Sequence, residues 1–305
     1  MQRMNLPGTD LSVPRLCLGT MTFGKPVGET EAIRLTHQAI DLGYTFIDTA
    51  NMYEGYARYV GSPGGVAEEI LGKALKGRRA EVVLATKVGM KVGPGPEDQG
   101  LGPRHVRREI DRSLARLDCD YVDLYYMHKP DPATPLEESI RIFDDLRVCG
   151  KIHAWGLSNF SADQVAEVLR LCDHNGWHRP VALQPPYSLL KRDIERDLLP
   201  LCVKEGLGIV PYQVLQGGAL SGKYRRGAPA PEGSRQREKP EWTIELSDAN
   251  FTILESLEAE ARSRGRSLME HALRSLLEMP GVVSLVVGAK RPEQLAELIE
   301  ASGTG

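Results

Sequence analysis

The segment VVLATK (residues 82–87) is a short apolar run that ends in a lysine, and it indicates how the chain folds. TFID (residues 45–48) precedes it and ends in an aspartate, and YVDLYYMH (residues 121–128) follows it and ends in a histidine. Short apolar runs of this kind are typical of strands buried on both faces in a parallel sheet. A segment of helical length separates each run from the next, so the local unit is strand, helix, strand.

The same alternation continues along the whole chain of 305 residues. Eight strand–helix units imply parallel pairing with right-handed crossovers, and at this length they predict an α/β fold, a closed (β/α)8 TIM barrel. We expect a single domain over residues 1–305, with a short hairpin within residues 1–13. The expected strands lie at or within residues 15–20, 45–50, 81–89, 121–128, 151–160, 181–186, 207–212 and 282–289. The expected helices lie at residues 31–43, 66–77, 103–118, 135–150, 161–176, 193–206, 250–264, 267–278 and 291–301.

The alternative α/β architecture is an open, doubly wound sheet. It usually carries a G-x-G-x-x-G turn after its first strand. The first strand here continues as CLGTMTFG (residues 17–24), which lacks that turn. The closed barrel is therefore the better interpretation.

Polar residues stand at the ends of three successive strands. Asp48 ends the second strand, with Tyr53 five residues later, Lys87 lies near the end of the third and His128 ends the fourth. In a barrel of parallel strands, polar groups at the carboxyl ends of the strands face the active site. Any one of the four has an ordinary structural explanation, but together they predict proton transfer to or from a substrate oxygen.

The chemistry of these four side chains suggests a role for each. An ammonium beside a phenol stabilises the phenolate and lowers its pKa, so Lys87 would tune Tyr53 as a general acid. Asp48 would hold the lysine charged, and His128 would orient a carbonyl substrate. Such a site suits the addition of a proton to an oxygen while a hydride reaches the adjoining carbon. Because no protein side chain delivers hydride, this reaction requires a nicotinamide cofactor.

The composition excludes several other classes of protein. A net charge of −3 argues against an electrostatic nucleic-acid binder. No apolar run approaches the roughly 20 residues of a membrane span, and the N-terminus lacks the apolar core of a signal peptide. His174 and His178 are four residues apart, a spacing typical of metal ligands, but no cysteine or acidic residue is evident as a further ligand, so a metal site is not predicted. The five scattered cysteines favour reduced, buried thiols in a cytoplasmic protein.

Several longer motifs resemble the aldo-keto reductase family. The resemblance runs nearly end to end and includes FIDTANMY, GVAEEILGKAL, LATK, YYMHKPD, GKIHAWGLSNF, QPPYSLL, GGALSGKY and GAKRPEQL. It implies a (β/α)8 barrel, NAD(P)(H) bound without a Rossmann fold, and reversible conversion of small carbonyl substrates to alcohols. It also implies that Tyr53 is the proton donor, supported by Asp48, Lys87 and His128.

The resemblance further implies residues that bind the cofactor. Ser158, Asn159 and Gln184 match contacts to the nicotinamide amide, although Ser158 and Asn159 also suit the start of a helix. Tyr212 matches the aromatic side chain that stacks on the ring. Further matches lie in the first-strand turn, in the diphosphate loop and at an adenosine contact, namely Gly19, Thr20, Leu215, Leu220, Ser221, Lys223 and Gln294.

The turn before the last helix predicts which nicotinamide cofactor is used. Gly288, Lys290 and Arg291 precede a helix that starts at Pro292. Backbone amides at a helix N-terminus favour an anion, and two adjacent cations add charge-assisted contacts to a 2′-phosphate. This favours NADPH over NADH. The chain departs from the resembling family at QVLQGG (residues 213–218), and at Leu298 where relatives often carry asparagine.

Residues 216–249 are rich in Gly, Pro, Arg and Glu and predict a long loop that lies over the cofactor. Two other functions remain open. Lys87 on a barrel strand suits a class I aldolase-type lyase that forms a Schiff base, and the resembling family includes channel β-subunits that bind cofactor with little turnover. Candidate walls of the substrate pocket are Met21, Phe23, Met52, Tyr56 and Lys129.

Overall fold

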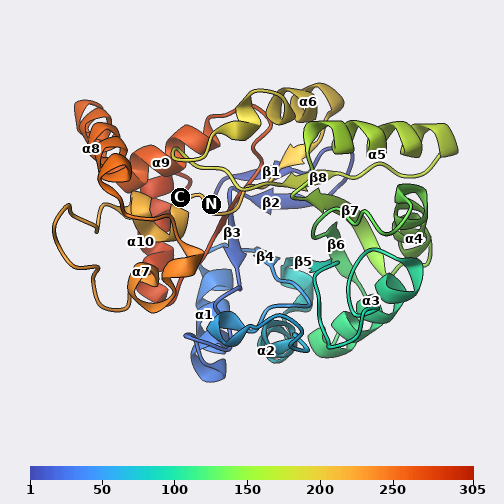
Figure 1. Cartoon of the computed structure of the whole chain (residues 1–305). Coiled ribbons are helices and arrows are strands. Elements are labelled where there is room, and N and C mark those ends of the chain that lie inside the picture. The colour runs from blue at the N-terminus through green and yellow to red at the C-terminus, as the bar shows by residue number, and fades with distance from the viewer.

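A computed structural model describes residues 1–305, and its main feature is one sheet of eight parallel strands. The strands are ordered β10-β3-β4-β5-β6-β7-β8-β9, so neighbours in sequence are neighbours in the sheet, as the alternating pattern predicts (Figure 1). The ring closes where Ile209 bridges Val282 in parallel and the Val286 N–H donates to the Pro211 carbonyl over 2.9 Å. The strands are β3 (Leu16–Gly19), β4 (Phe46–Asp48), β5 (Val83–Val88), β6 (Val122–Met127), β7 (Ile152–Ser158), β8 (Ala182–Gln184), β9 (Gly208–Ile209) and β10 (Leu285–Val287).

Helices surround the strands on the outside of the ring (Figure 1). A cluster of 55 buried residues fills the space between them and is the main apolar core. The α5 helix shows how local sequence sets the boundaries, because Ser161 and Gln164 form the reciprocal capping box that their spacing predicts. The helices are α1 (Glu29–Asp41), α2 (Val66–Ala74), α3 (Pro103–Leu117), α4 (Leu136–Val148), α5 (Ala162–Asn175), α6 (Leu198–Glu205), α7 (Arg235–Glu238), α8 (Asp248–Ser263), α9 (Leu268–Leu277) and α10 (Pro292–Ser302).

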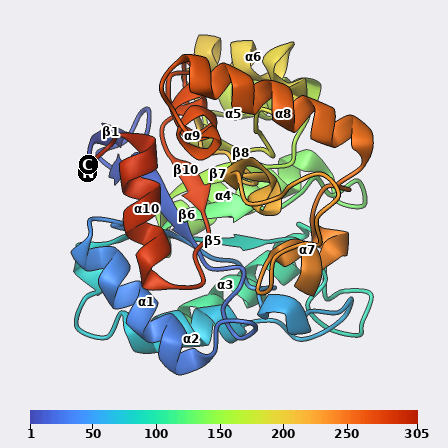
Figure 2. The same ribbon diagram turned by 90° about the vertical axis from the view of Figure 1, so that its left-hand side faces the viewer.

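A short antiparallel hairpin covers the N-terminal end of the barrel, at the opposite end from α7 (Figure 2). It consists of β1 (Arg3–Asn5) and β2 (Ser12–Pro14), so it extends one residue beyond the expected range. Leu6 and Val13 of the hairpin join the apolar cluster inside the barrel. The termini meet here, because the Gln2 N–H donates to the Thr304 carbonyl over 2.7 Å.

The segment 216–249 is more ordered than its composition suggests. It contains a 3-10 turn at Gln216–Ser221, the short helix α7 and a second 3-10 turn at Pro240–Trp242. The next helix starts two residues earlier than expected because Ser247 accepts a hydrogen bond from the backbone of Asn250 and caps it.

All five cysteines are free, and Cys17, Cys172 and Cys202 are buried as predicted, but Cys119 is only half-buried and the prediction is wrong for Cys149, which is exposed. It follows α4 at a helix end, where the chain turns back toward β7. None of the helices is both long and apolar enough to cross a membrane.

Candidate active site

The position of the candidate residues follows from the two-residue period of the barrel strands. Phe46, Ala85, Tyr126 and Ala182 point into the barrel and belong to its inner apolar cluster. The residues two positions later on each strand point the same way and lie one layer nearer the carboxyl end. Those residues are Asp48, Lys87, His128 and Gln184. The same strand geometry therefore places an apolar floor beneath a layer of polar side chains.

Lys87 is the centre of this polar layer. Its side chain is fully buried and is ion-paired with Asp48. Its ammonium also donates to the Thr49 carbonyl over 2.8 Å and contacts the Tyr53 hydroxyl oxygen at 3.2 Å. The second Asp48 oxygen accepts a hydrogen bond of 2.9 Å from the Gln184 amide. Every donor of the lysine is thus directed at a specific oxygen.

His128 completes the group from the neighbouring strand. Its ring centroid lies 6.0 Å from that of Tyr53, with the two rings at 79°. Its Nδ1 atom is buried without a hydrogen-bond partner. Tyr53 and His128 both keep a partly exposed face. The structure therefore brings together all four residues that the sequence singles out, with a phenol and an imidazole on the open side.

The electrostatics of the group differ in one respect from the prediction. Burial raises the pKa of the Tyr53 phenol and outweighs the nearby Lys87, which acts to lower it. The predicted shift of this pKa toward neutrality is therefore wrong, because the sequence reveals the charge but not the desolvation. Burial also opposes the charge of Lys87, but Asp48 and Tyr53 prevail and raise the lysine pKa. Burial, with Lys87 and Lys129, holds the pKa of His128 well below its usual value.

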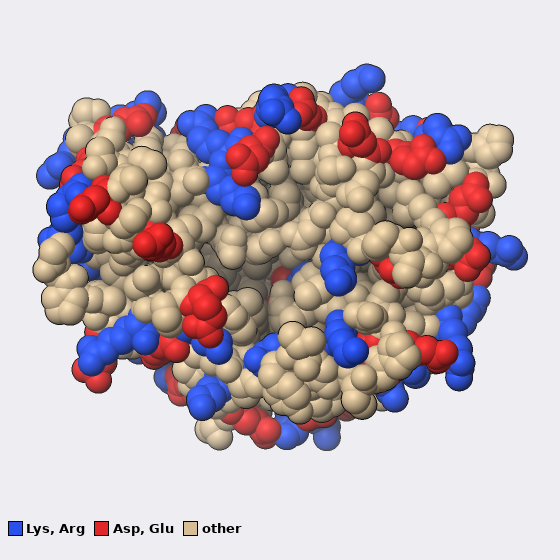
Figure 3. Space-filling view, viewed as in Figure 1, with Lys and Arg blue, Asp and Glu red and all other residues tan.

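A cavity of about 780 Å³ opens at this end of the barrel, and Asp48 and Tyr53 line it. Figure 3 looks toward this face and shows the hollow near its centre. The sequence-predicted cofactor residues that line the cavity come from the ends of several strands, from the segment after β9 and from the start of α10. They are Gly19, Thr20, Gln184, Tyr212, Leu215, Ser221, Lys223, Gly288, Lys290, Arg291 and Gln294.

Ser158 and Asn159 do not line the cavity but are hydrogen-bonded to residues that do. The Ser158 hydroxyl donates to the Gln184 carbonyl over 2.8 Å, and the Tyr212 hydroxyl donates to Asn159 Oδ1 over 2.8 Å. The Asn159 amide in turn donates to the His128 carbonyl over 2.9 Å. Asn159 has a φ of +64°, a conformation that asparagine tolerates better than most residues. The two residues thus support the polar layer from the side.

Four cations gather at the far end of the cavity. Lys223, Arg235, Lys290 and Arg291 all line it, and the last two immediately precede α10. Burial and the positive charges of Lys290, Arg235 and Arg291 lower the pKa of Lys223. This concentration of positive charge suits a phosphate group.

The segment 231–242, hereafter the strap, lines the same cavity with its two ends, residues 231–235 and 241–242. Glu238 of the strap is ion-paired with Lys290, whose ammonium also donates to the Gly233 carbonyl over 3.0 Å. Trp242 packs edge-on against Tyr56, with ring centroids 5.6 Å apart. Sequence reasoning did not identify Arg235, Glu238 or Trp242, although a lone tryptophan in a polar segment is a signal of a specific contact.

Two of the predicted positions have side chains buried in apolar clusters, away from the cavity. The Leu220 side chain is fully buried in a small apolar cluster with α8 and α9, so the structure does not place it against a ligand. Phe23 is fully buried in the main core and cannot form a wall of the pocket. Of the other candidate walls, Met21 lines the cavity, Met52 and Tyr56 are partly exposed, and Lys129 is exposed.

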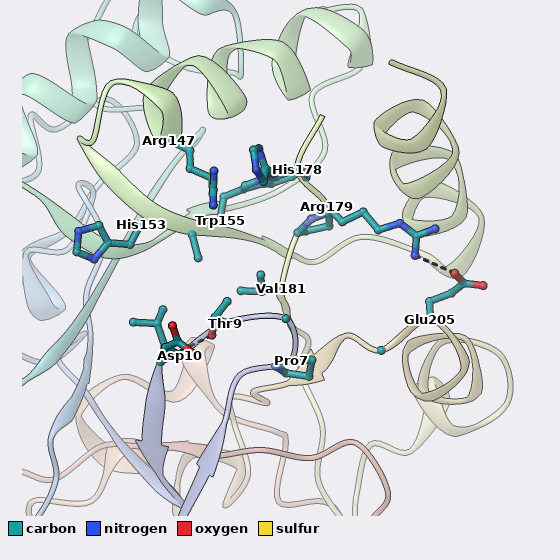
Figure 4. A pocket seen from close by; sticks show the side chains of 15 residues that line it. Pro7, Thr9, Asp10, Arg147, His153, Trp155, His178, Arg179, Val181 and Glu205 are labelled. Carbon is teal, nitrogen blue, oxygen red and sulfur yellow. Dashed lines mark hydrogen bonds and ion pairs between the residues drawn. The ribbon is translucent and has the colours of Figure 1, made fainter. Parts of the chain in front are cut away.

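A second cavity of about 600 Å³ lies at the opposite end of the barrel, beside the hairpin turn (Figure 4). Most of its charged groups are already paired within the protein. Arg179 binds Asp173 and Glu205, and His178 binds Asp144 over 2.8 Å. None of the four polar-layer residues lines it. It is therefore not the candidate active site.

Comparison with known proteins agrees with this geometry. The profile of the aldo/keto reductase family matches residues 15–304. The chain belongs to the aldo/keto reductase family. The family and the barrel fold predicted from the sequence are thereby confirmed.

Relatives of this aldo/keto reductase family member carry two kinds of name. A probable voltage-gated potassium channel subunit beta from Arabidopsis thaliana is 34% identical over 99% of this chain and 91% of its own length. L-glyceraldehyde 3-phosphate reductase from Escherichia coli is 33% identical over 95% of this chain and 84% of its own. Aldo-keto reductase YhdN from Bacillus subtilis is 31% identical over 99% of this chain and 89% of its own. Membership of the family is thus compatible with enzymes and with channel subunits.

Proposed function

We propose that this protein is an NADPH-dependent reductase that reversibly converts aldehydes or ketones to alcohols. The observation that carries the proposal is the Tyr53 hydroxyl, held 3.2 Å from a buried lysine ammonium at the wall of a large cavity. A phenol in this position can donate a proton to a carbonyl oxygen. The reductase names of two of the relatives above support the same reaction class.

Four side chains have separate roles in proton transfer. Tyr53 donates the proton, and Lys87 stabilises the negative charge that develops on the phenol oxygen as the proton leaves. Asp48 keeps Lys87 charged and fixed. His128 is neutral at physiological pH, because its pKa is held well below the usual value, and it orients the carbonyl oxygen by a hydrogen bond.

The cavity fits a nicotinamide dinucleotide. Gln184 and Tyr212, supported by Ser158 and Asn159, would hold the nicotinamide, and the cations around the start of α10 would hold the 2′-phosphate. When bound, NADPH supplies the hydride that reduces the carbonyl carbon. The segment 216–249, and the strap within it, would then lie over the cofactor.

The direct test is loss of NADPH absorbance on addition of a panel of aldehydes and ketones, including phosphorylated aldehydes. We expect turnover with at least one class of carbonyl and none without carbonyl. A folded protein that binds NADPH but reduces none of the panel would contradict the proposal.

The free cysteines suit a reducing compartment, and we place the enzyme in the cytoplasm on that ground.

The pH dependence of the reaction follows from the pKa shifts of the site. Reduction requires a protonated phenol and a neutral imidazole. The raised pKa of Tyr53 keeps the phenol protonated, and the lowered pKa of His128 keeps the imidazole neutral, from about pH 6 to about pH 9. We therefore expect kcat for reduction to be nearly flat over this range and kcat for alcohol oxidation to rise with pH. Steady-state rates in both directions check this, and a fall in the reductive kcat centred near pH 7 would contradict it.

Two substitutions should move the affinity for NADPH in opposite directions. Lys290→Ala removes a charge-assisted contact to the 2′-phosphate, so we expect NADPH to bind roughly tenfold more weakly. Glu238→Gln frees Lys290 from its partly exposed ion pair, so we expect NADPH to bind about two- to fivefold more tightly. NADH should bind equally to both variants and the parent protein. Fluorescence titration measures the affinity of the parent protein and of both variants for NADPH and NADH. The charge-matched control for Glu238→Gln is Glu255→Gln, because Glu255 is an ion-paired residue of α8 outside the cavity lining.

A second candidate function is that of a cofactor-binding regulatory subunit with little turnover. The channel-subunit names of relatives that cover nearly the whole chain support it. A stable complex with a membrane partner and negligible reductase activity would favour this function. The lyase alternative is disfavoured by the site, because a fully buried lysine that is ion-paired and has a raised pKa is a poor nucleophile.

A further inference from the structure

The loop that carries Tyr53 is hydrogen-bonded to the helical shell by the Asn51 side chain, which reaches α3, and by the Tyr53 carbonyl, which accepts from the Ala67 N–H of α2 over 3.0 Å. Asn51 is fully buried, two residues before Tyr53. Its amide nitrogen donates to Glu109 Oε2 over 3.1 Å, whereas its own side-chain oxygen is buried without a partner. Glu109 is therefore the residue that fixes the orientation of this side chain.

Glu109 is itself held rigidly. It lies on α3 with a fully buried carboxylate, although it is outside the cavity. Its Oε1 atom accepts hydrogen bonds from Arg112 over 2.9 Å and from Arg108 over 3.2 Å. Its other oxygen is left for Asn51, with Arg116 Nη2 4.0 Å away. Two guanidinium groups thus set the direction of the carboxylate that reaches the catalytic loop.

A second buried carboxylate reaches the neighbouring strand in the same way. Glu68 of α2 accepts a hydrogen bond of 2.6 Å from Thr86, the residue before Lys87. Its other oxygen pairs with Arg116 at 2.5 Å. Arg116 therefore lies between Glu68 and Glu109, and the two carboxylates contact residues close to each end of the Tyr53–Lys87 contact.

The backbone around Asn51 leaves little freedom for the loop to find another position. Its N–H donates to the Lys87 carbonyl over 3.2 Å, and its own carbonyl packs against Gly64. A Cβ atom on Gly64 would lie 2.1 Å from that carbonyl oxygen, and Gly64 has a φ of +72°. Lys87 and Gly64 thus fix the backbone of Asn51, and Glu109 fixes its side chain, so the loop before Tyr53 is held from both sides.

We propose that Glu109 is a positioning residue for the reaction, acting through Asn51 to keep the Tyr53 hydroxyl at hydrogen-bond distance from Lys87. This inference rests on the proposed function of Tyr53 as proton donor. A buried carboxylate surrounded by arginines is a weak source of stability compared with apolar packing, which leaves geometry as its main contribution. Misplacement of a reacting group by about 1 Å can lower a rate about 100-fold.

A double-mutant cycle tests whether Glu109 acts through Asn51. We expect Asn51→Ala and Glu109→Leu, which removes the acceptor for the Asn51 amide, each to lower kcat about tenfold or more, with the affinity for NADPH and the KM of the carbonyl changed less than about twofold. The double variant should be no slower than the slower single variant, because both changes remove the same contact. Ser139→Ala is the control, since its buried hydroxyl donates to the Leu101 carbonyl over 3.3 Å, outside the cavity lining. It should lower the melting temperature without lowering kcat.

A second measurement does not depend on turnover. Lys87 acts to lower the pKa of the Tyr53 phenol, so a phenol displaced from Lys87 should titrate at higher pH. Ultraviolet titration of the parent protein, Asn51→Ala and Glu109→Leu should show this rise in both variants, once the titration of the matching protein that also carries Tyr53→Phe is subtracted from each. Wild-type kcat with an unmoved Tyr53 titration in Asn51→Ala would overturn the inference while leaving the reductase function intact. A parent protein that reduces no carbonyl would instead refute the proposed function, and the titration would still decide whether Glu109 positions Tyr53.

Discussion

Replacing Tyr53 with phenylalanine is expected to lower kcat for carbonyl reduction roughly 10²- to 10⁴-fold, the usual contribution of a general acid. The ring remains, so its contact with His128 and the shape of the cavity should be retained. Only the hydroxyl that lies 3.2 Å from the Lys87 ammonium is lost. The affinity for NADPH should change less than about twofold, because the predicted cofactor contacts come from other residues.

Tyr44→Phe is a suitable control for this substitution. Its hydroxyl is fully buried and donates to the Leu295 carbonyl over 2.8 Å, outside the lining of the cavity. Removal of that hydrogen bond should lower stability by about 1 kcal/mol without lowering kcat. Single-turnover reduction by preloaded NADPH measures the chemical step in both variants. Equal rates for Tyr53→Phe and the parent protein would exclude Tyr53 as the proton donor.

Replacing Lys87 with methionine is expected to affect stability as well as activity. The methionine fills much the same volume, but it leaves the Asp48 carboxylate buried without its cation. Breaking a buried ion pair on one side costs about 3–5 kcal/mol, which urea unfolding can measure. The kcat should fall by a factor of about 10² or more, because the developing phenolate loses its stabilising charge.

The double variant Asp48→Asn with Lys87→Met separates the two effects. It contains no unpaired buried charge, and the asparagine introduced in place of Asp48 would keep a hydrogen-bonding partner in Gln184. Most of the lost stability should therefore return, while kcat should stay low. A double variant that recovers kcat together with stability would show that the ion pair is structural only.

The polar layer could be predicted from the sequence because it depends on local regularities. Apolar runs identify the strands, and the two-residue period then places Asp48, Lys87 and His128 on the inner face at one end. The pKa of Tyr53 could not be predicted in the same way. Its direction depends on how much water the folded barrel excludes, which no neighbouring residue in the sequence reveals.

Contacts between distant segments also could not be predicted from the sequence. Trp242 and Glu238 lie in a Gly- and Pro-rich stretch, and only the fold brings them to Tyr56 and Lys290. Glu109 stands in the run RREIDR, where a glutamate normally indicates a solvated helix face. In the structure that face is covered, and the neighbouring arginines compensate the buried charge.

The meeting of the two chain ends beneath the hairpin has a practical consequence for protein engineering. Residues 2 and 304 share a backbone hydrogen bond at the end of the barrel remote from the catalytic cavity. A short linker could join them, and the chain could be reopened at an exposed connection elsewhere, such as Gly150 between α4 and β7. A circularly permuted form of residues 1–305 should keep its strand order and cavity, and its new termini at Gly150 would serve as the attachment points for a fusion partner.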